Sequence, residues 1–505
     1  MFYNCASLVT IKVSPTVSFD SLTNSTNMFY GCNSIVGGAG TTWTSDHIDV
    51  SGACIDRVKD TGTWGVTTGY FTCNENVCRI IRDEQKIADY PTLNAAYAAS
   101  QAGDTIEVYA DSSLTAALDA KKNLTIKSEA GSKHRIFVGN FYITASSGIT
   151  FTVEDIIFDG QNRVKEGAAF GTFNDNTVAH VNNCEFVDLI SSSPWPGALL
   201  RQKSTTYFNN TNFTNCHSTS ESSSGTVIDM DDTGTTCIFD GGTISNCADG
   251  ASLWDSPVFV GPGNTFTFKS GEVCNNLGVH GVLTTNGGTI NVEGGSIHDN
   301  SVVNDGGAIY LGDKTSSSSS TGNVSGGEIY NNYAKRTAGA IEVRPNAVLN
   351  LSGGYIHDNK VDSTSSNVGY GAIAGLSASY HGSVKLSGNP IVTNNYYGDT
   401  QANLLVYDAS TLSVSNLGDD ANIGVYALDT LSAFGATFAN ALSGAASAIE
   451  NLGKISNDIT NGLIAVPVDE TSTGIKWGNE ADGICKIVRT GEALASIEAA
   501  YAKAE

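Results

Sequence analysis

The sequence predicts an all-β fold, a right-handed parallel β-helix in which short strands stack coil upon coil. Three observations predict it. Single apolar residues recur every 24 to 35 residues, Gly-Gly precedes several of them, and a polar turn residue follows each after two or three positions. The apolar residues, which we expect to point inward, are Phe158, Phe186, Phe213, Ile244, Val273, Ile297, Ile329, Ile356 and Ile391. Gly and Asn suit tight turns because both accept positive φ at low cost.

Each predicted coil carries more than one strand. A second family is predicted at Gly307–Tyr310, Gly339–Glu342 and Gly371–Ala374, with period-two alternation and small apolar residues facing a narrow core. The repeated Asn residues are expected to adopt the left-handed conformation and to hydrogen-bond to the Asn of the next coil. Length variation is expected in loops such as Ser316–Ser320 and Asp362–Asn367.

The two ends of the β-helix are predicted to be closed. Pro near the first helical position and an apolar face made by Leu93, Ala96 and Tyr97 predict a short helical N-terminal cap. Such a cap would cover the unpaired strand edges of the first coil. After Asn395 we expect closing strands at residues 404–407, 412–414 and 423–425, a possible helix over Phe434–Leu452, and a terminal strand with a linker over 463–480.

Repeats set the predicted domain boundaries. Met1–Leu8 recurs as Met28–Ile35, and a period in the twenties is typical of leucine-rich-repeat coils. Val77–Arg82 recurs as Ile484–Arg489, about 405 residues later, which suggests the start of a second, truncated unit. The predicted organisation is therefore a partial leucine-rich-repeat segment at 1–72, a linker and strand at 73–90, the β-helix at 91–400, closing strands and a helix at 401–480, and a truncated unit at 481–505. We expect the native chain to be longer and this module to be monomeric.

Charge and cysteine content exclude several classes of protein. The net charge of −24, with only 27 Lys and Arg, lacks the basic patch that nucleic-acid binding requires. No run of 18 apolar residues is present, so no membrane span is predicted. The 11 cysteines form no CxxC pair and no Cys/His cluster at zinc spacing, so no metal site is predicted. An acidic surface would tolerate scattered Ca²⁺, although no Ca²⁺ motif is present and no cofactor is expected.

The quoted repeats carry two family resemblances. Met1–Leu8 and Met28–Ile35, followed by Ile35–Thr41 and ending at Gly69–Thr72, resemble the BspA-like leucine-rich-repeat surface proteins of bacteria. The coils from Pro91 to Asn395 resemble the pectin-lyase-like β-helices of large bacterial surface adhesins. These resemblances imply an extracellular or cell-surface location and contact with carbohydrate or with a host surface protein.

Carboxylates are the candidate catalytic groups, because β-helices also support polysaccharide lyases and glycoside hydrolases. General acid and base catalysis needs two carboxyl groups about 5–10 Å apart. The best cluster is Asp229, Asp231 and Asp232, with Asp240 nearby, and a second group comprises Asp155, Asp159 and Asp188. An acidic turn on a solvated face is the simpler interpretation of both groups, so we assign no catalytic residue.

Three other sets of residues bear on binding. Trp195 and Trp254 are weak candidates for sugar-stacking platforms on loops, although packing against the coils is favoured. His298 and His357 hold the same position two coils apart with Tyr330 between them, which predicts a stacked aromatic ladder on the outer face. Cys216 and Cys247 share a coil position, where we expect buried thiols, with an inter-coil disulfide as the alternative.

The favoured function is that of a non-enzymatic adhesin-like protein, whose β-helix acts as a rigid stalk or as a binding face. The alternatives are a polysaccharide lyase or glycoside hydrolase, and a purely structural spacer.

Overall fold

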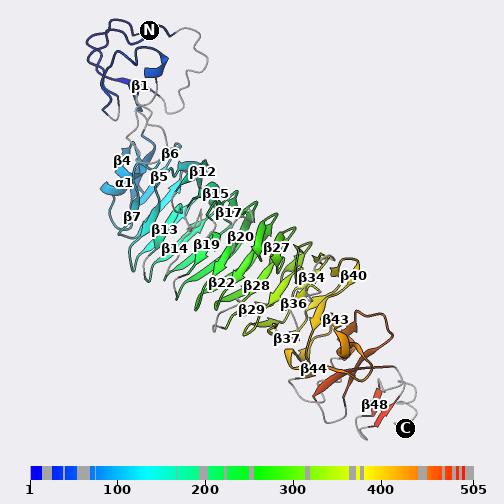
Figure 1. Cartoon of the computed structure of the whole chain (residues 1–505). Coiled ribbons are helices and arrows are strands. Elements are labelled where there is room, and N and C mark those ends of the chain that lie inside the picture. The colour runs from blue at the N-terminus through cyan, green and yellow to red at the C-terminus, as the bar shows by residue number, and fades with distance from the viewer. Residues whose placement is uncertain are drawn as a thin grey trace.

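A computed structural model of the chain describes residues 2–13, 25–37, 40–53, 69–73, 76–165, 168–173, 175–192, 203–220, 224–231, 233–248, 255–312, 319–362, 371–375, 380–441, 452–468, 473–479, 485–487 and 492–494. Most of them form one elongated stack of short strands, with the two ends of the chain at its opposite ends (Figure 1). The stack makes about ten turns between residues 112 and 457. The prediction of a parallel β-solenoid is therefore confirmed.

The N-terminal segment has a small core of its own. Phe2 stacks on Phe29 and Tyr3 stacks on Tyr30, with ring centroids 5.6 and 5.5 Å apart. The two copies of the repeated sequence therefore lie against each other. Beyond them, strand β1 (Ile11–Val13) pairs in parallel with β2 (Phe71–Cys73), and η1 (Val50–Gly52) is a single 3₁₀ turn.

An antiparallel arrangement begins the main body. Strand β3 (Cys78–Arg82) pairs antiparallel with both β4 (Gln85–Tyr90) and β5 (Thr105–Val108). Helix α1 (Leu93–Ala99) lies in the chain between β4 and β5 and contacts all three strands.

Helix α1 occurs where the sequence predicts a helix, with Pro91 two residues before its first residue. The side chain of Thr92 is the N-cap and accepts a hydrogen bond from the N–H of Ala95 over 3.1 Å. Pro91 therefore precedes the cap, and it does not occupy the first helical position. Leu93 and Ala96 are buried in the main core, as the apolar pattern predicts.

Three columns of parallel strands run along the stack. Residues in successive strands of a column pair in register, which places equivalent residues of neighbouring coils roughly 4.8 Å apart. The first column consists of β5, β8 (Leu124–Ser128), β11 (Thr150–Glu154), β14 (Val178–Asn182), β16 (Thr205–Asn209), β20 (Thr236–Ser245), β22 (Thr265–Cys274), β25 (Thr289–Val292), β29 (Thr321–Val324), β33 (Val348–Leu351), β37 (Ser383–Gly388), β42 (Leu412–Leu417) and β44 (Thr437–Ala441).

The second column shares the long strands β20 and β22 with the first. Its other members are β6 (Ser112–Ser113), β9 (His134–Phe137), β12 (Ile156–Lys165), β15 (Glu185–Ser191), β17 (Asn212–Thr214), β26 (Ser296–His298), β30 (Glu328–Tyr330), β34 (Tyr355–His357), β38 (Ile391–Val392), β43 (Asn422–Ala427) and β45 (Ile455–Asn457), and β18 (His217–Ser218) also pairs with β15. The third column comprises β7 (Leu118–Ala120), β10 (Ile143–Ala145) and β13 (Phe170–Phe173), and then β19 (Gly225–Met230), β21 (Ser256–Val260), β24 (Leu283–Thr285), β28 (Ile309–Leu311), β32 (Ile341–Val343), β36 (Ile373–Ala374) and β41 (Leu404–Val406).

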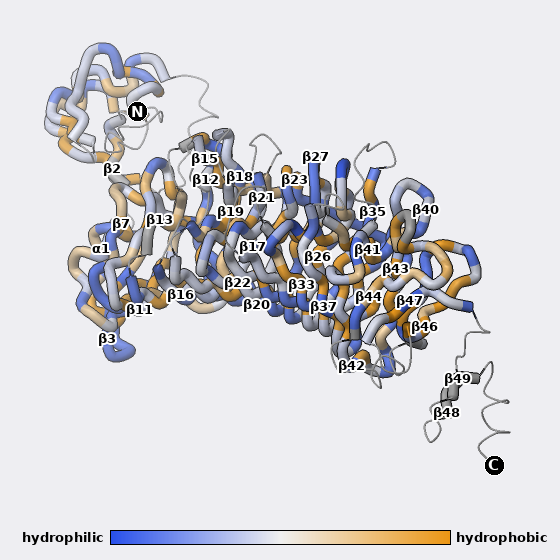
Figure 2. The backbone as a smooth tube through the Cα atoms, turned by 60° about the horizontal axis from the view of Figure 1, so that its bottom comes forward, coloured by the Kyte–Doolittle hydropathy of each residue, from blue (hydrophilic) through white to orange (hydrophobic). Residues whose placement is uncertain are grey.

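A further six-stranded sheet lies along one side of the stack (Figure 2). We call it the flanking sheet. It consists of β23 (Leu277–His280), β27 (Ser301–Asp305), β31 (Tyr333–Ala334), β35 (Lys360–Val361), β39 (Tyr396–Tyr397) and β40 (Thr400–Gln401). The sequence analysis did not predict this sheet.

One continuous core runs through the columns from Val77 to Trp477. Eight of the nine predicted inward positions, from Phe158 to Ile356, are at most 1% exposed. The ninth is wrong by one residue, because Val392 pairs with Ile356 and is buried while Ile391 is partly exposed. Phe158, Phe186 and Phe213 stack at 5.0 and 4.8 Å.

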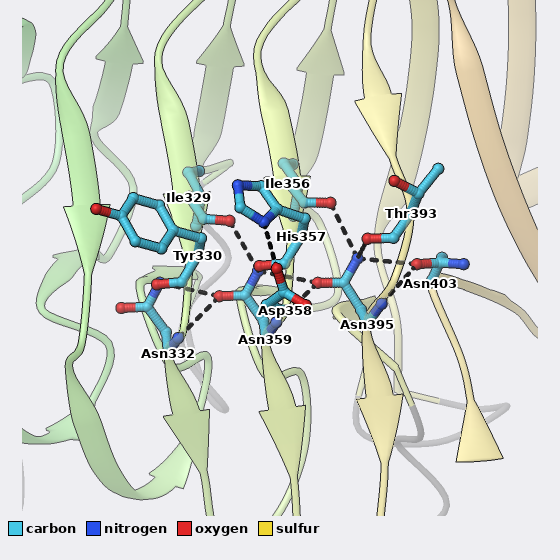
Figure 3. A network of polar contacts seen from close by, with 10 residues as sticks. All are labelled: Ile329, Tyr330, Asn332, Ile356, His357, Asp358, Asn359, Thr393, Asn395 and Asn403. Atoms are coloured by element: carbon cyan, nitrogen blue, oxygen red, sulfur yellow. Dashed lines mark hydrogen bonds and ion pairs between the residues drawn. The ribbon is translucent and has the colours of Figure 1, made fainter. Parts of the chain in front are cut away.

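A ladder of buried asparagines joins successive coils at the corner after the second column (Figure 3). The Oδ1 of Asn332 accepts hydrogen bonds from the N–H and the Nδ2 of Asn300, over 3.2 and 2.9 Å. The Nδ2 of Asn332 donates to the carbonyl of Ile297 and to the Oδ1 of Asn359. The same pattern links Asn276, Asn300, Asn332, Asn359, Asn395 and Asn403, all of which are at most 2% exposed.

The ladder and the left-handed turn occupy adjacent residues, whereas the sequence analysis assigned both roles to one. The left-handed residue comes first, at Asp299, Asn331, Asp358 and Asn394, with φ between 53° and 56°. The ladder asparagine follows directly, because its amide must lie inside the coil to reach both neighbours.

Earlier coils fill the ladder position with other residues. Cys247 donates its N–H to the Oδ1 of Asn276 over 2.9 Å, and Cys216 donates its N–H to the Sγ of Cys247 over 3.4 Å. Both thiols are buried and neither forms a disulfide. The prediction of buried turn thiols is therefore confirmed, and the disulfide alternative is wrong.

The C-terminal part corrects the predicted helix. The closing strands occur where they are expected, as β41, β42 and β43. Phe438, however, lies in strand β44, which pairs antiparallel with β47 (Gly474–Gly478), and its ring stacks on that of Trp477 at 4.0 Å. Two short 3₁₀ turns flank the proposed helical range: η3 (Asp429–Ser432) precedes it, and η4 (Leu452–Lys454) begins at its last residue.

The final strands form hairpins. Strand β46 (Ile464–Pro467) pairs antiparallel with β47, so this region holds two strands instead of the predicted one. Strands β48 (Cys485–Ile487) and β49 (Glu492–Leu494) also pair antiparallel, as β3 and β4 do in the earlier copy of that sequence. A further 3₁₀ turn, η2 (Ala409–Thr411), precedes β42. The predicted loops at 316–320 and 362–367 lie mostly outside the described residues.

Candidate functional site

The outward-facing side chains of the second column form a polar and aromatic strip. Residues before and after each buried core residue point outward, because side chains alternate along a strand. We define the outer strip as Glu272, Cys274, Ser296, His298, Glu328, Tyr330, Tyr355 and His357, which come from four neighbouring strands paired in register.

Stacked rings occupy much of the outer strip. His298 stacks on Tyr330 and Tyr330 stacks on His357, with centroids 4.8 and 5.2 Å apart and nearly parallel planes. Tyr355 stacks on His357 at 3.8 Å. The predicted aromatic ladder is therefore confirmed.

A group of metal-ligating side chains lies at the N-terminal end of this strip. Glu272, Cys274 and His298 each offer one ligand atom, and these atoms lie within 4.8 Å of one another. Cys274 and His298 pair directly across β22 and β26, and Glu272 is two residues before Cys274 on the same face. Burial raises the pKa of the Cys274 thiol, and the negative charges of Glu272 and Asp299 raise it further.

Sequence analysis missed this group although the signal was present. Cys274 follows its core residue Val273 by one position, as His298 follows Ile297. Zinc motifs are recognised by short spacings between ligands along the chain. In a solenoid the ligands can come from successive coils, which here places Cys274 and His298 24 residues apart. Comparing equivalent positions between neighbouring coils would have found it.

A second polar group lies buried between the flanking sheet and the third column. Asp305 of β27 is fully buried and binds two guanidinium groups. Arg344 Nη2 donates to its Oδ2 over 2.9 Å, and Arg336 contacts both carboxylate oxygens. Burial opposes ionisation, but hydrogen bonds from Arg336 and His280, together with the positive charges of Arg336 and Arg344, hold the pKa of Asp305 below its ordinary value.

Glu342 of β32 completes this buried group. Its Oε1 lies 3.3 Å from the Nε of Arg344, and the hydroxyl of Thr337 lies 2.7 Å from its Oε2. Burial, reinforced by the negative charge of Asp305, raises the pKa of Glu342 to about 8. Two carboxyl groups with pKa values moved in opposite directions are typical of catalytic sites, but also of structural ion pairs.

Aromatic rings close the group on the side of the third column. The guanidinium carbon of Arg344 lies 5.3 Å from the centroid of the Tyr310 ring. The centroids of the His280 and Tyr310 rings are 5.0 Å apart. The side chains of Asp305, Glu342 and Arg344 have no exposed surface. A substrate therefore has no access to them in this conformation, and we assign the group to fastening the flanking sheet to the solenoid. The sequence analysis did not single out any of these residues, because only the fold brings them together.

The carboxylates proposed from the sequence have different surroundings. Asp229 lies in β19 and is only 2% exposed, while Asp231 follows the strand and is partly exposed. Asp232, Trp195 and Trp254 lie outside the described residues. In the second proposed group, Asp159 is buried and paired with Arg135.

Other proteins offer no guide to the site. No protein-family model matches this chain, and neither a curated protein nor a solved structure matches it. Within the part of the chain that the structure describes, no helix is both long enough and apolar enough to cross a membrane. The fold class, a parallel β-solenoid with a flanking sheet, is what the geometry establishes.

Proposed function

We propose that this protein is a non-enzymatic, adhesin-like component of a bacterial cell surface or of the secreted proteins, in which a right-handed β-helix is a rigid stalk. The observation that carries the proposal is the buried asparagine ladder. It ties successive coils together through buried amides, which hydrogen-bond both to the next asparagine and to a backbone carbonyl of the preceding coil. A right-handed coil is expected because parallel strand connections have that hand almost without exception.

The outer strip is the binding face that we favour. Its rings repeat at the coil spacing, so a repetitive polymer such as a polysaccharide or mucin glycan would meet equivalent groups along it. Aromatic side chains offer apolar surface with a polar edge, which suits sugar recognition. The leucine-rich-repeat character of residues 1–72 and the capping role of α1 belong to the same proposal.

The enzymatic alternative has less support. Asp229 is nearly fully buried. Glu342, whose pKa is raised to about 8, is also completely buried. An acid or base must reach its substrate within hydrogen-bond distance. Neither residue meets that requirement in this conformation.

Glycan and mucin arrays probed with the whole chain test the proposal. We expect binding that falls at least tenfold in a Tyr330→Ala/Tyr355→Ala double variant. Tyr207→Ala is the matched control, because Tyr207 also stacks on an outward-facing histidine, His180, at 5.0 Å, but in the first column.

Two outcomes would overturn the proposal. A chain that binds no glycan and no mucin would act as a spacer. Release of new reducing ends from uronate-rich or neutral polysaccharides, abolished by Asp231→Asn/Asp232→Asn, would identify an enzyme.

A further inference from the structure

We propose that Glu272, Cys274 and His298 bind a Zn²⁺ ion on the outer face of the solenoid, bridging two neighbouring coils. The three ligand atoms already lie within 4.8 Å of one another. A tetrahedral zinc ion with bonds of 2.0–2.3 Å separates its ligands by roughly 3.5 Å. The side chains therefore need to close by only about 1 Å, which rotations of their own χ angles can provide.

The register of the strands explains why these groups converge. Cys274 and His298 are direct partners in the parallel pair β22–β26, so one coil rise separates them. Glu272 faces the same way as Cys274 because it is two residues earlier in the strand. Two ligands thus come from one coil and the third from the next.

The surroundings of His298 match those of a metal-binding imidazole. The Oδ2 of Asp299 lies 2.7 Å from the Nδ1 of His298, which favours a proton on that nitrogen and leaves Nε2 as the metal-binding lone pair. A carboxylate that orients a histidine in this way is the usual outer-shell partner in zinc sites. Tyr330 stacks on one face of the His298 ring. Cys274 lies on the opposite side of that ring, in the preceding coil. The imidazole must therefore turn toward Cys274 to bind the metal.

The ligand set selects the metal. One sulfur, one nitrogen and one carboxylate oxygen suit Zn²⁺, whereas Ca²⁺ and Mg²⁺ prefer oxygen alone. Three protein ligands leave a fourth position for water. The nearby carboxylates of Glu272 and Asp299 supply negative charge that favours a cation.

The chain contains its own matched control two coils further along. His357 resembles His298, with Asp358 2.6 Å from its Nδ1, Glu328 in the position of Glu272, and Tyr330 in the position of Cys274. The thiol is missing, and Tyr355 stacks on His357 where Ser296 lies beside His298. His357→Ala therefore removes an equivalent ring without touching the proposed site.

Titration of the whole chain with Co²⁺ and then with Zn²⁺ tests the site, in a Cys5→Ser background that removes the one exposed thiol among the cysteines whose burial the structure describes. We expect a near-ultraviolet thiolate-to-cobalt charge-transfer band that Zn²⁺ abolishes by displacement. Cys274→Ser should eliminate the band, and His298→Ala should weaken binding at least tenfold. Asp299→Asn should weaken it about 10- to 100-fold, as expected for an outer-shell partner, whereas His357→Ala should change it less than twofold.

The variants are chosen to preserve the fold. Ser245 occupies the position of Cys274 in the preceding coil, so serine is compatible with this corner. Asn is found at the left-handed position of the next coil, at Asn331, so Asp299→Asn keeps the turn. Circular dichroism and thermal unfolding verify folding, and Zn²⁺ should raise the melting temperature of the parent but not of Cys274→Ser. The proposal is overturned if the folded parent shows no charge-transfer band, or if Cys274→Ser binds Zn²⁺ as tightly as the parent.

Discussion

Asn403 donates both its backbone N–H and its side-chain amide to the carboxylate of Asp458, each over 2.7 Å. The buried asparagine ladder therefore ends on an acceptor that has no proton to donate when ionised. Each asparagine before it donates to the next member of the ladder and accepts from the previous residue, and the last step, from Asn395 to Asn403, spans only the β39–β40 hairpin. The polarity of the ladder thus requires an acceptor at its C-terminal end.

Replacing that acceptor tests its importance. In Asp458→Asn one carboxylate oxygen becomes an NH₂ group, which cannot accept a hydrogen bond. One of the two donors of Asn403 would then face this NH₂ group or remain unpaired, which costs about 1–3 kcal/mol. We expect urea unfolding to show this loss, whereas Asp419→Asn, at a fully exposed carboxylate that forms a surface pair with Lys454, should leave the unfolding midpoint unchanged within error. Equal stability of Asp458→Asn and the parent would contradict the role given to the carboxylate.

The interior of the ladder should be more sensitive than the outer asparagines. Asn332→Ala removes an acceptor for two donors of Asn300, and it leaves the Oδ1 of Asn359 with only the backbone N–H of residue 332 as a donor from that coil. We expect a loss of about 2–4 kcal/mol in the free energy of unfolding. Asn323→Ala, in a partly exposed ladder between Asn291 and Asn350, should lose about 1 kcal/mol or less, and a reversed order would refute the argument.

Alanine substitutions at two glycines can distinguish the cost of backbone strain from the cost of steric clash. Gly103 and Gly327 have similar φ values of 87° and 81°, but a Cβ on Gly103 would meet nothing within 4 Å. A Cβ on Gly327 would lie 2.8 Å from the carbonyl oxygens of Gly294 and Gly295 in the preceding coil. We expect Gly103→Ala to cost about 1–2 kcal/mol through φ alone, and Gly327→Ala to cost clearly more. Similar melting temperatures for the two variants would show that the coils can separate to make room.

The stability of the protein should depend on pH through Glu342. Its folded-state pKa of about 8 exceeds the ordinary value of 4.5, so the folded state retains a proton that the unfolded chain releases between these values. The contribution is fully present below about pH 4.5 and is lost as the pH rises through about 8. The Gln side chain of Glu342→Gln does not titrate. Relative to this variant, the free energy of unfolding of the parent should fall by about 2–4 kcal/mol between pH 5 and 8.5.

Denaturant unfolding at several pH values measures this difference. The other groups around Glu342, namely Asp305, Arg336, Arg344, Tyr310 and His280, are present in both proteins, so their titration largely cancels. Parallel stability curves for the two proteins would show that Glu342 is ionised throughout the range.

The sequence predicted the features that repeat and missed those that depend on contacts between elements. The core position of each coil was visible from Phe158 to Ile356, because an apolar residue recurs beside similar turn residues. The one-residue error at Ile391 arose because Pro390 and Ile391 interrupt the Gly-Gly pattern that marks the other coils.

Contacts across the fold explain the larger errors. Phe434 and Phe438 have helical spacing, but Phe438 stacks on Trp477, which is 39 residues further along the chain and holds this segment as a strand. The flanking sheet was missed because its strands are only two to five residues long, too short to show an alternating pattern. The Glu272–Cys274–His298 group was missed because its members are neighbours only once the coils are stacked in register.

The flanking sheet has a mechanical consequence. It joins successive coils on one side of the rod between residues 277 and 401, and it is fastened there by the contacts of Asp305 with Arg336 and Arg344. This stretch therefore has a stiff side and a compliant side. A force applied to the two ends would therefore bend the rod in the direction that does not stretch the flanking strands. The deformation would concentrate in the coils that precede β23, which have no flanking sheet among the residues that the structure describes.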